Sequence, residues 1–150
     1  MNADLSDILR LLQNLIRLGT IAEVDGAKVR VQFGPNLTTE WLKWITPCAG
    51  STRTWSVPTV GEQVIALSPG GDLTRGTIVP ALYFKEFDAP ETSNTIHTTH
   101  YPNGAMVQYD HASHELTATL PGGTATITVD KVTSNAPSTI CTGDLTVMKT

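Results

Sequence analysis

Apolar positions at the start of the chain recur with the spacing of a helix. Leucine and isoleucine follow the i, i+3, i+4, i+7 rule and form one stripe: Leu5, Ile8, Leu11, Leu12, Leu15 and Leu18. Gly19 follows this stripe and is a common helix stop. The pattern predicts an amphipathic helix over residues 1–18. Its apolar side needs a partner, either the rest of this chain or the same helix in other copies.

Over residues 19–87 the pattern changes to that of short strands. Asp25-Gly26 separates two alternating runs, which is a strong hairpin signal. Three more strand-like runs follow turns or loops: EWLKWITP, GEQVIALSP and TRGTIVPALYF. Such closely spaced strands predict a five-stranded closed barrel of the oligonucleotide/oligosaccharide-binding (OB) type. The three tryptophans, Trp41, Trp44 and Trp55, lie in this segment, and at least two of them are expected in the core.

A polar segment with Pro90, residues 88–95, is the predicted linker. Beyond it, tight turns separate strand-like runs at 96–101, 105–109, 115–120, 124–132 and 139–147. In HELTATLPGGTATITV, one side of the hairpin is nearly all threonine. The other side carries small or medium apolar residues: Leu116, Ala118, Leu120, Ala125, Ile127 and Val129. So thin a sheet buries too little surface to offset chain entropy alone.

Three identical copies wound about a threefold axis would solve this problem. The six apolar residues would then meet at the centre, and threonine would cover the outside. The expected fold is therefore mainly β: a helix, an OB barrel, and an intertwined trimeric β-helix stalk over residues 96–150. A monomeric second β-domain packed on the first is the alternative. Lys149-Thr150 carries no closing signal, so the stalk is expected to be truncated before its apex.

Composition narrows the function classes. Charged residues make up 16% of the chain, below the ~25% of average globular proteins, and threonine takes their place. The net charge of −4 argues against a nucleic-acid partner. No run is long and apolar enough to cross a membrane as a helix. Cys48 and Cys141 lie far apart and are predicted to be buried, reduced thiols.

No motif for catalysis or cofactor binding stands out. The chain lacks G-x-S-x-G, H-E-x-x-H and a Walker loop, so we expect neither an enzyme nor a cofactor. The histidines form two i, i+3 pairs: His97 with His100, and His111 with His114. On strands such pairs point to opposite faces, which favours solvated histidines over a metal site.

Residues 40–83 carry an ordered set of motifs that resembles one family. They are Trp41-Leu42-x-Trp44, Arg53-Thr54-Trp55, Pro58-x-x-Gly61-Glu62-Gln63-Val64, and Gly70-Gly71-Asp72 before Gly76-Thr77-Ile78-Val79-Pro80. Together they resemble the OB domain of contractile-tail baseplate spikes, the baseplate assembly protein V family of phages and R-type pyocins. YPNGAMVQYD is similar to the F-P-D-G-A-x-x-x-Y hairpin that opens the family's β-helix.

The resemblance implies a homotrimeric central spike in the tail baseplate of a virion, assembled in the host bacterial cytoplasm. Such a spike docks on a baseplate hub protein and is driven through the host outer membrane when the sheath contracts. The resemblance implies no catalysis. Family members end in an apex where an H-x-H motif binds iron. This sequence has no H-x-H, so no metal is carried over.

Two other functions stay open at this point. An OB module that binds oligonucleotides or sugars would use Trp41, Trp44 or Trp55 as a stacking platform beside Lys43 and Arg53. The spike of a type VI secretion system shares the expected architecture. That spike usually comes fused to a large hub domain, which this chain lacks.

Overall fold

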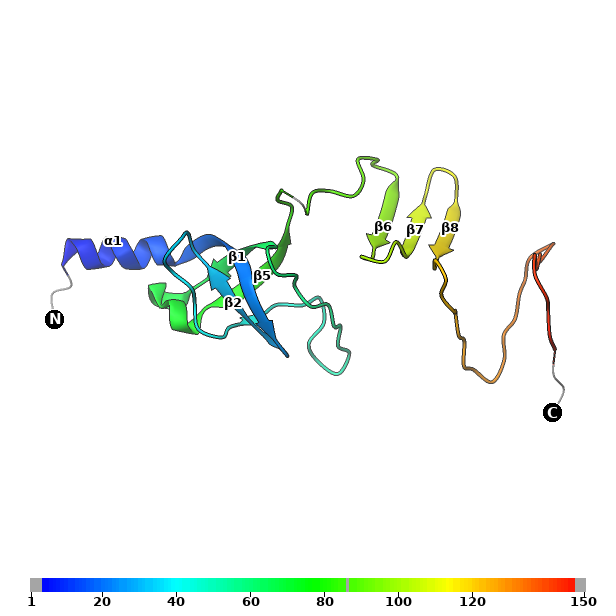
Figure 1. Ribbon diagram of the computed structural model, residues 1–150, viewed down its shortest axis with the longest axis horizontal. Helices are drawn as coiled ribbons and strands as arrows, with labels where there is room; N and C mark the ends of the chain where they lie inside the picture. Colours follow the sequence, from blue (N-terminus) through cyan, green and yellow to red (C-terminus); the bar gives the residue numbers. More distant parts are fainter. Residues whose placement is uncertain (1–3, 86, 148–150) are drawn as a thin grey trace. The chain divides into compact units, whose positions relative to one another are not determined.

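The computed structural model describes residues 4–85 and 87–147 and divides into two compact units, Met1–Thr92 and Ser93–Thr150 (Figure 1). The division falls within the segment predicted as a linker, 88–95. Residues 1–3, 86 and 148–150 lie outside the described part. The outer ends of the predicted helix and stalk therefore also lie outside it.

The first unit opens with helix α1 (Leu5–Asn14), which is shorter than predicted. The chain enters strand β1 (Ile16–Asp25) directly afterwards, and Arg17 and Leu18 pair with strand β4 (Gln63–Leu67). The prediction that the helix extends to residue 18 is therefore wrong. Leucines at 15 and 18 fit a helical stripe, but pairing with β4 gives this stretch its backbone hydrogen bonds and overrides that spacing.

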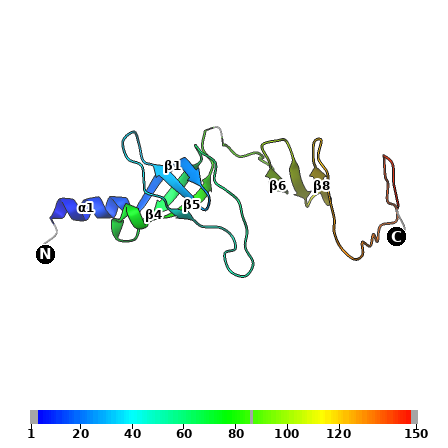
Figure 2. The ribbon, with the colours of Figure 1, turned by 60° about the horizontal axis from the view of Figure 1, so that its bottom comes forward.

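Five strands form a nearly closed barrel (Figure 2). Beside β1 and β4 they are β2 (Lys28–Gln32), β3 (Lys43–Trp44) and β5 (Thr77–Leu82), in the order β2-β1-β4-β5-β3. Val29 and Leu42 exchange two backbone hydrogen bonds of 2.9 Å, which bring β2 beside the start of β3. The predicted OB-like barrel is confirmed. The turn expected after β4 consists of two 3-10 helices, η1 (Pro69–Gly71) and η2 (Leu73–Arg75).

Mainly aliphatic side chains, with one phenylalanine, fill the barrel. The core consists of Ile21, Val29, Val31, Phe33, Leu42, Val64, Ala66 and Ile78. Trp44 is half-buried and packs against this core, whereas Trp41 is 37% exposed and Trp55 67% exposed. The prediction that two tryptophans lie in the core is wrong. Branched aliphatic residues from the strands already fill this small interior, and Trp55 lies in the long loop between β3 and β4.

Gly19 lies buried within β1 rather than at a helix end. A Cβ at this position would lie 2.5 Å from Val31 Cγ1 and 2.8 Å from the Gln32 carbonyl oxygen. Because one of these atoms belongs to the backbone, a rotamer change cannot relieve the clash. We expect Gly19→Ala to lower the free energy of unfolding by about 1–3 kcal/mol, measured by urea denaturation.

The matched control is Gly50→Ala, because a Cβ at Gly50 would meet no atom within 4 Å. This control should unfold at the urea concentration of the wild type. Equal stability of the two variants would show that β1 and β2 do not pack this closely at Gly19.

The second unit is an antiparallel meander of β6 (Ile96–His100), β7 (Met106–Asp110) and β8 (Glu115–Thr119). These three strands were predicted. The further strands predicted at 124–132 and 139–147 do not form in the single chain. A strand needs a backbone partner, and this stretch pairs with no other described segment.

Candidate oligomerisation surface

The strand register of the meander gathers apolar side chains on one face. Tyr109 lies opposite Leu116, and Val107 lies opposite Ala118. On the other side of β7, the polar residues His97 and Thr99 of β6 lie opposite Tyr109 and Val107 and share their face. Directly opposed residues share a face, and alternation along each strand extends that face to its neighbours. The resulting meander apolar face comprises Tyr101, Ala105, Val107, Tyr109, Leu116, Ala118 and Leu120. Four of these seven, Tyr101, Ala105, Val107 and Leu120, line one shallow pocket.

This face is largely open to solvent in the single chain. Leu116 is 73% exposed, Tyr101 is 51% exposed, and Val107 is 44% exposed. Ala105 is the one hydrophobic residue of the second unit that is buried within the described part of the chain. A contiguous exposed apolar patch of this kind marks an interaction surface.

The opposite face of the meander is mainly polar. Its central row consists of Thr98, Gln108 and Thr117, and its end rows carry Asp110, Glu115, His100 and Thr119 beside Ile96 and Met106. The sheet is therefore two-sided, and its apolar face gains more free energy by leaving water than its mainly polar face does.

The structure places the six predicted interface residues in two groups. Leu116, Ala118 and Leu120 lie on the meander apolar face. Ala125, Ile127 and Val129 follow in a stretch without regular strands and are exposed. Four members of the face were not predicted: Tyr101, Ala105, Val107 and Tyr109. The alternation in AMVQYD carries the signal that would have found Val107 and Tyr109.

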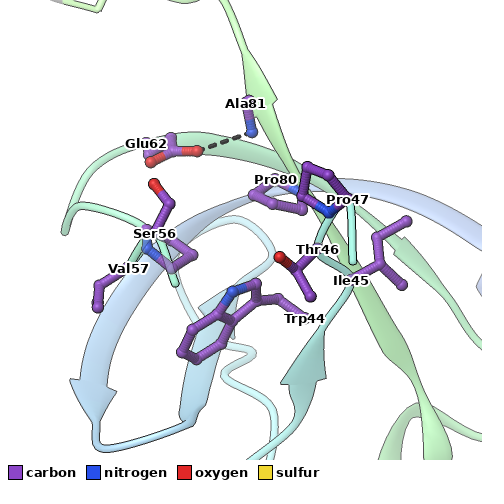
Figure 3. Close-up of a pocket in the computed structure, with 10 residues that line it drawn as sticks. Trp44, Ile45, Thr46, Pro47, Ser56, Val57, Glu62, Pro80 and Ala81 are labelled. Atoms are coloured by element: carbon purple, nitrogen blue, oxygen red, sulfur yellow. Dashed lines mark hydrogen bonds between the residues drawn. The ribbon is translucent and has the colours of Figure 1, made fainter. Parts of the chain in front are cut away.

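The structure brings two of the three tryptophans, Trp44 and Trp55, together. The rings of Trp44 and Trp55 are 5.6 Å apart at an interplanar angle of 53°. Trp44 also lines a mainly apolar groove with residues from the β3–β4 loop and the end of β5 (Figure 3). Trp41 lies 5.8 Å from the Arg30 guanidinium, which also binds Glu23 Oε1 at 2.8 Å. Arg30 is not one of the cations predicted for the stacking platform. Lys43 lies on β3 and Arg53 in the β3–β4 loop, and both are exposed.

Glu62 closes the end of the groove and has a structural role. Its carboxylate accepts the backbone N–H of Ala81 at 2.7 Å (Figure 3). It also accepts the backbone N–H of Thr59 at 2.9 Å. Ala81 has a φ of +70°, which is uncommon for a residue other than glycine. Glu62 therefore holds the strained end of β5 against the loop before β4.

Both cysteines are free and exposed, so the prediction that they are buried is wrong. Cys48 lies in the loop between β3 and β4, and Cys141 lies in the irregular stretch after β8. Their surroundings lack the packed apolar shell that the composition suggested.

His97 and His100 lie on β6, whereas His111 and His114 lie in the β7–β8 turn. Among the residues that the structure describes, no group of three or more His, Cys, Asp or Glu is placed to hold a metal ion.

Two carboxylates are held in their charged form by hydrogen bonds. The hydroxyl and backbone N–H of Thr74 donate to Asp72 Oδ1 at 2.7 and 2.9 Å, which lowers the pKa of Asp72. The backbone N–H of Ala112 donates to Asp110 Oδ1 at 2.9 Å and is the main cause that lowers the pKa of Asp110. One carboxylate fixes the start of η2, and the other fixes the β7–β8 turn.

These shifts predict a loss of stability in acid. A carboxyl whose pKa is lower in the folded state stabilises the fold above its usual pKa of 3.8, and the effect disappears as the pH falls through the lowered value. We expect the double variant Asp72→Asn/Asp110→Asn to unfold at lower urea than the wild type at pH 7. The difference in urea midpoint between the variant and the wild type should be smaller at pH 3. A difference that is unchanged or larger at pH 3 would contradict the prediction.

Comparisons with known proteins agree with this architecture. Residues 17–83, from β1 to just beyond β5, match the family described as the type VI secretion system/phage-baseplate injector OB domain. The chain is also 34% identical over 160 residues to the spike protein of Escherichia phage P2, an alignment that covers 95% of this chain and 75% of that protein. In the described part of the chain, no helix is long and apolar enough to span a membrane. The alignment to the phage P2 protein covers both units, and the chain therefore belongs to the phage baseplate spike family.

Proposed function

We propose that this chain forms the homotrimeric central spike of a contractile phage tail and pierces the host outer membrane on sheath contraction. The meander apolar face carries this proposal. A single copy leaves it in water, and three copies about an axis would bury it. Family membership supports the same role, because the relative in phage P2 is itself named a spike protein.

A threefold arrangement accounts for the chemistry of both faces of the meander. Small and medium-sized residues such as Val107, Leu116 and Ala118 would fill a narrow centre. The threonines of the other face would point outward, where they favour strand conformation and expose little apolar surface. The irregular stretch after β8 would gain backbone partners from neighbouring chains. The stalk would then be stiff and slow to unfold, as piercing requires.

The remaining partners follow from the same role. The OB barrel would dock on the baseplate hub protein, and the trimer would contact the host outer membrane during infection. It would belong to the tail baseplate of the virion after assembly in the host cytoplasm. We propose no enzymatic activity, no cofactor and no nucleic-acid partner. Addition of single-stranded DNA should leave the tryptophan fluorescence unchanged, and quenching would instead favour a binding OB module.

The solution mass tests the proposal directly. Size-exclusion chromatography with light scattering, on unboiled protein at micromolar concentration, should give about three times the chain mass of 16.1 kDa. The species should persist on dilution and resist SDS until heated. A monomer would overturn the proposal and leave the meander apolar face without an explanation.

A further inference from the structure

We infer that three copies of α1 pack together through one apolar seam and form a short parallel bundle in the spike. This inference rests on the proposed homotrimer and adds an interface separate from the stalk. The seam consists of Leu5, Ile8, Leu12 and Leu15. Their spacing of three, four and three residues is that of the a and d positions of a coiled coil.

The seam is unpartnered in the single chain. Leu5 is 68% exposed, Leu12 is 56% exposed, and Ile8 is 43% exposed. A helix in water normally buries such a stripe, because each leucine gains about 1.5–3 kcal/mol on full burial. The rest of the chain covers the seam only in part, at its C-terminal end, where Leu15 is 37% exposed.

The barrel holds only the last turn of α1. The carbonyl oxygen of Leu15 accepts the backbone N–H of Ser68 at 2.9 Å. Gly71 of η1 lies against the backbone of Leu11, so closely that a Cβ on Gly71 would clash with it. From this anchor α1 extends away from the barrel (Figures 1 and 2). This anchor sets the direction of α1. Ile8, Leu12 and Leu15 line a pocket with Gly70 of η1, whereas Leu5 at the start of the helix stays 68% exposed.

The charges on α1 indicate which surface fits the seam. No charged residue lies at its a and d positions. Asp7 and Arg10 fall at positions c and f and pair with each other at 3.5 Å. An uncharged seam of leucine and isoleucine is best matched by an equally apolar helix, and in a cyclic trimer each copy carries an identical seam. Leu9 and Leu11 flank the seam and make the stripe wider than a two-stranded pairing covers, which favours three helices.

The length of α1 explains why the bundle needs the rest of the spike. A helix of ten residues is too short to associate by itself in water. Barrels and stalks joined in one trimer would hold the three seams together at a high effective concentration, on the order of millimolar. The bundle should therefore form in the full-length trimer.

Disulfide trapping tests the bundle in the full-length chain. In a Cys48→Ser/Cys141→Ser background, Ile8→Cys places a thiol on the seam, and Arg10→Cys places one on the opposite side of the same helix. Two thiols crosslink only when their Cα atoms approach within about 7 Å. After mild oxidation, boiled non-reducing gels should show up to two thirds of the Ile8→Cys chains as covalent dimers. The Arg10→Cys chains should stay single.

Two further variants keep the test decisive. Leu5→Cys lies at the most exposed seam position and should crosslink as Ile8→Cys does. If one of these two variants fails to fold, the other still tests the bundle. Adding Leu12→Asp to Ile8→Cys should abolish the crosslink, whereas the reduced protein should keep its trimeric mass. Crosslinking that survives Leu12→Asp would overturn the inference, because it would reflect random collision.

The same samples separate the two proposals. A monomeric mass of the reduced protein would overturn both the spike and the bundle. A trimeric mass with equal crosslinking at positions 8 and 10 would overturn the bundle alone. Protection of the Ile8→Cys thiol only after addition of the baseplate hub protein would also overturn it and assign the seam to the hub.

Discussion

Leu116→Asp is expected to convert the proposed trimer into monomers. Leu116 is 73% exposed in the single chain, so the change should leave the fold of the meander intact. In the trimer, three carboxylates would enter the apolar centre close to one another. Burying a charge without a partner costs several kcal/mol, and here the cost arises three times in one assembly.

The matched control is Thr119→Asp, which adds the same charge to the same strand on the opposite face. Thr119 lies opposite Met106 in the register and is exposed. Light scattering should give a trimer for Thr119→Asp and a monomer for Leu116→Asp. A trimeric Leu116→Asp would show that the meander apolar face is not the interface. Dissociation of both variants would point to general charge repulsion in the stalk.

Ile78→Ala should produce the largest loss of stability in the barrel. Ile78 is fully buried at 0% exposure, on β5 between β4 and β3. Removing three carbon atoms from such a site loses their burial and leaves a cavity, at a cost of about 2–5 kcal/mol. For a domain of this size the thermal midpoint should fall by on the order of 10 °C or more.

Ile45→Ala makes the same chemical change at a residue that is 49% exposed, and it should shift the midpoint much less. Both variants should keep their oligomeric mass at room temperature, because the stalk lies in the second compact unit. Equal losses at positions 45 and 78 would contradict the position of the core.

The sequence by itself determined the features that depend on neighbours along the chain. The Asp25-Gly26 turn set the β1–β2 hairpin, because few residues other than glycine adopt the φ of +53° found at Gly26. Alternation with period two separated the apolar from the threonine face of the meander. Leu116, Ala118 and Leu120 were found in this way, and the same pattern extends to Val107 and Tyr109.

Only the tertiary structure decided features that depend on distant partners. Residues 16–18 fit a helical stripe and a strand equally well, and pairing with β4 selected the strand. The sequence predicted a helix stop at Gly19, but close packing against Val31 is the reason for the glycine. The sequence also predicted tryptophans in the core, whereas branched aliphatic residues fill the barrel. Residues 124–147 alternate like strands but have no partner within the described chain. A local pattern specifies which face of an element is apolar, but the surface that buries it comes from elsewhere in the chain or from another copy.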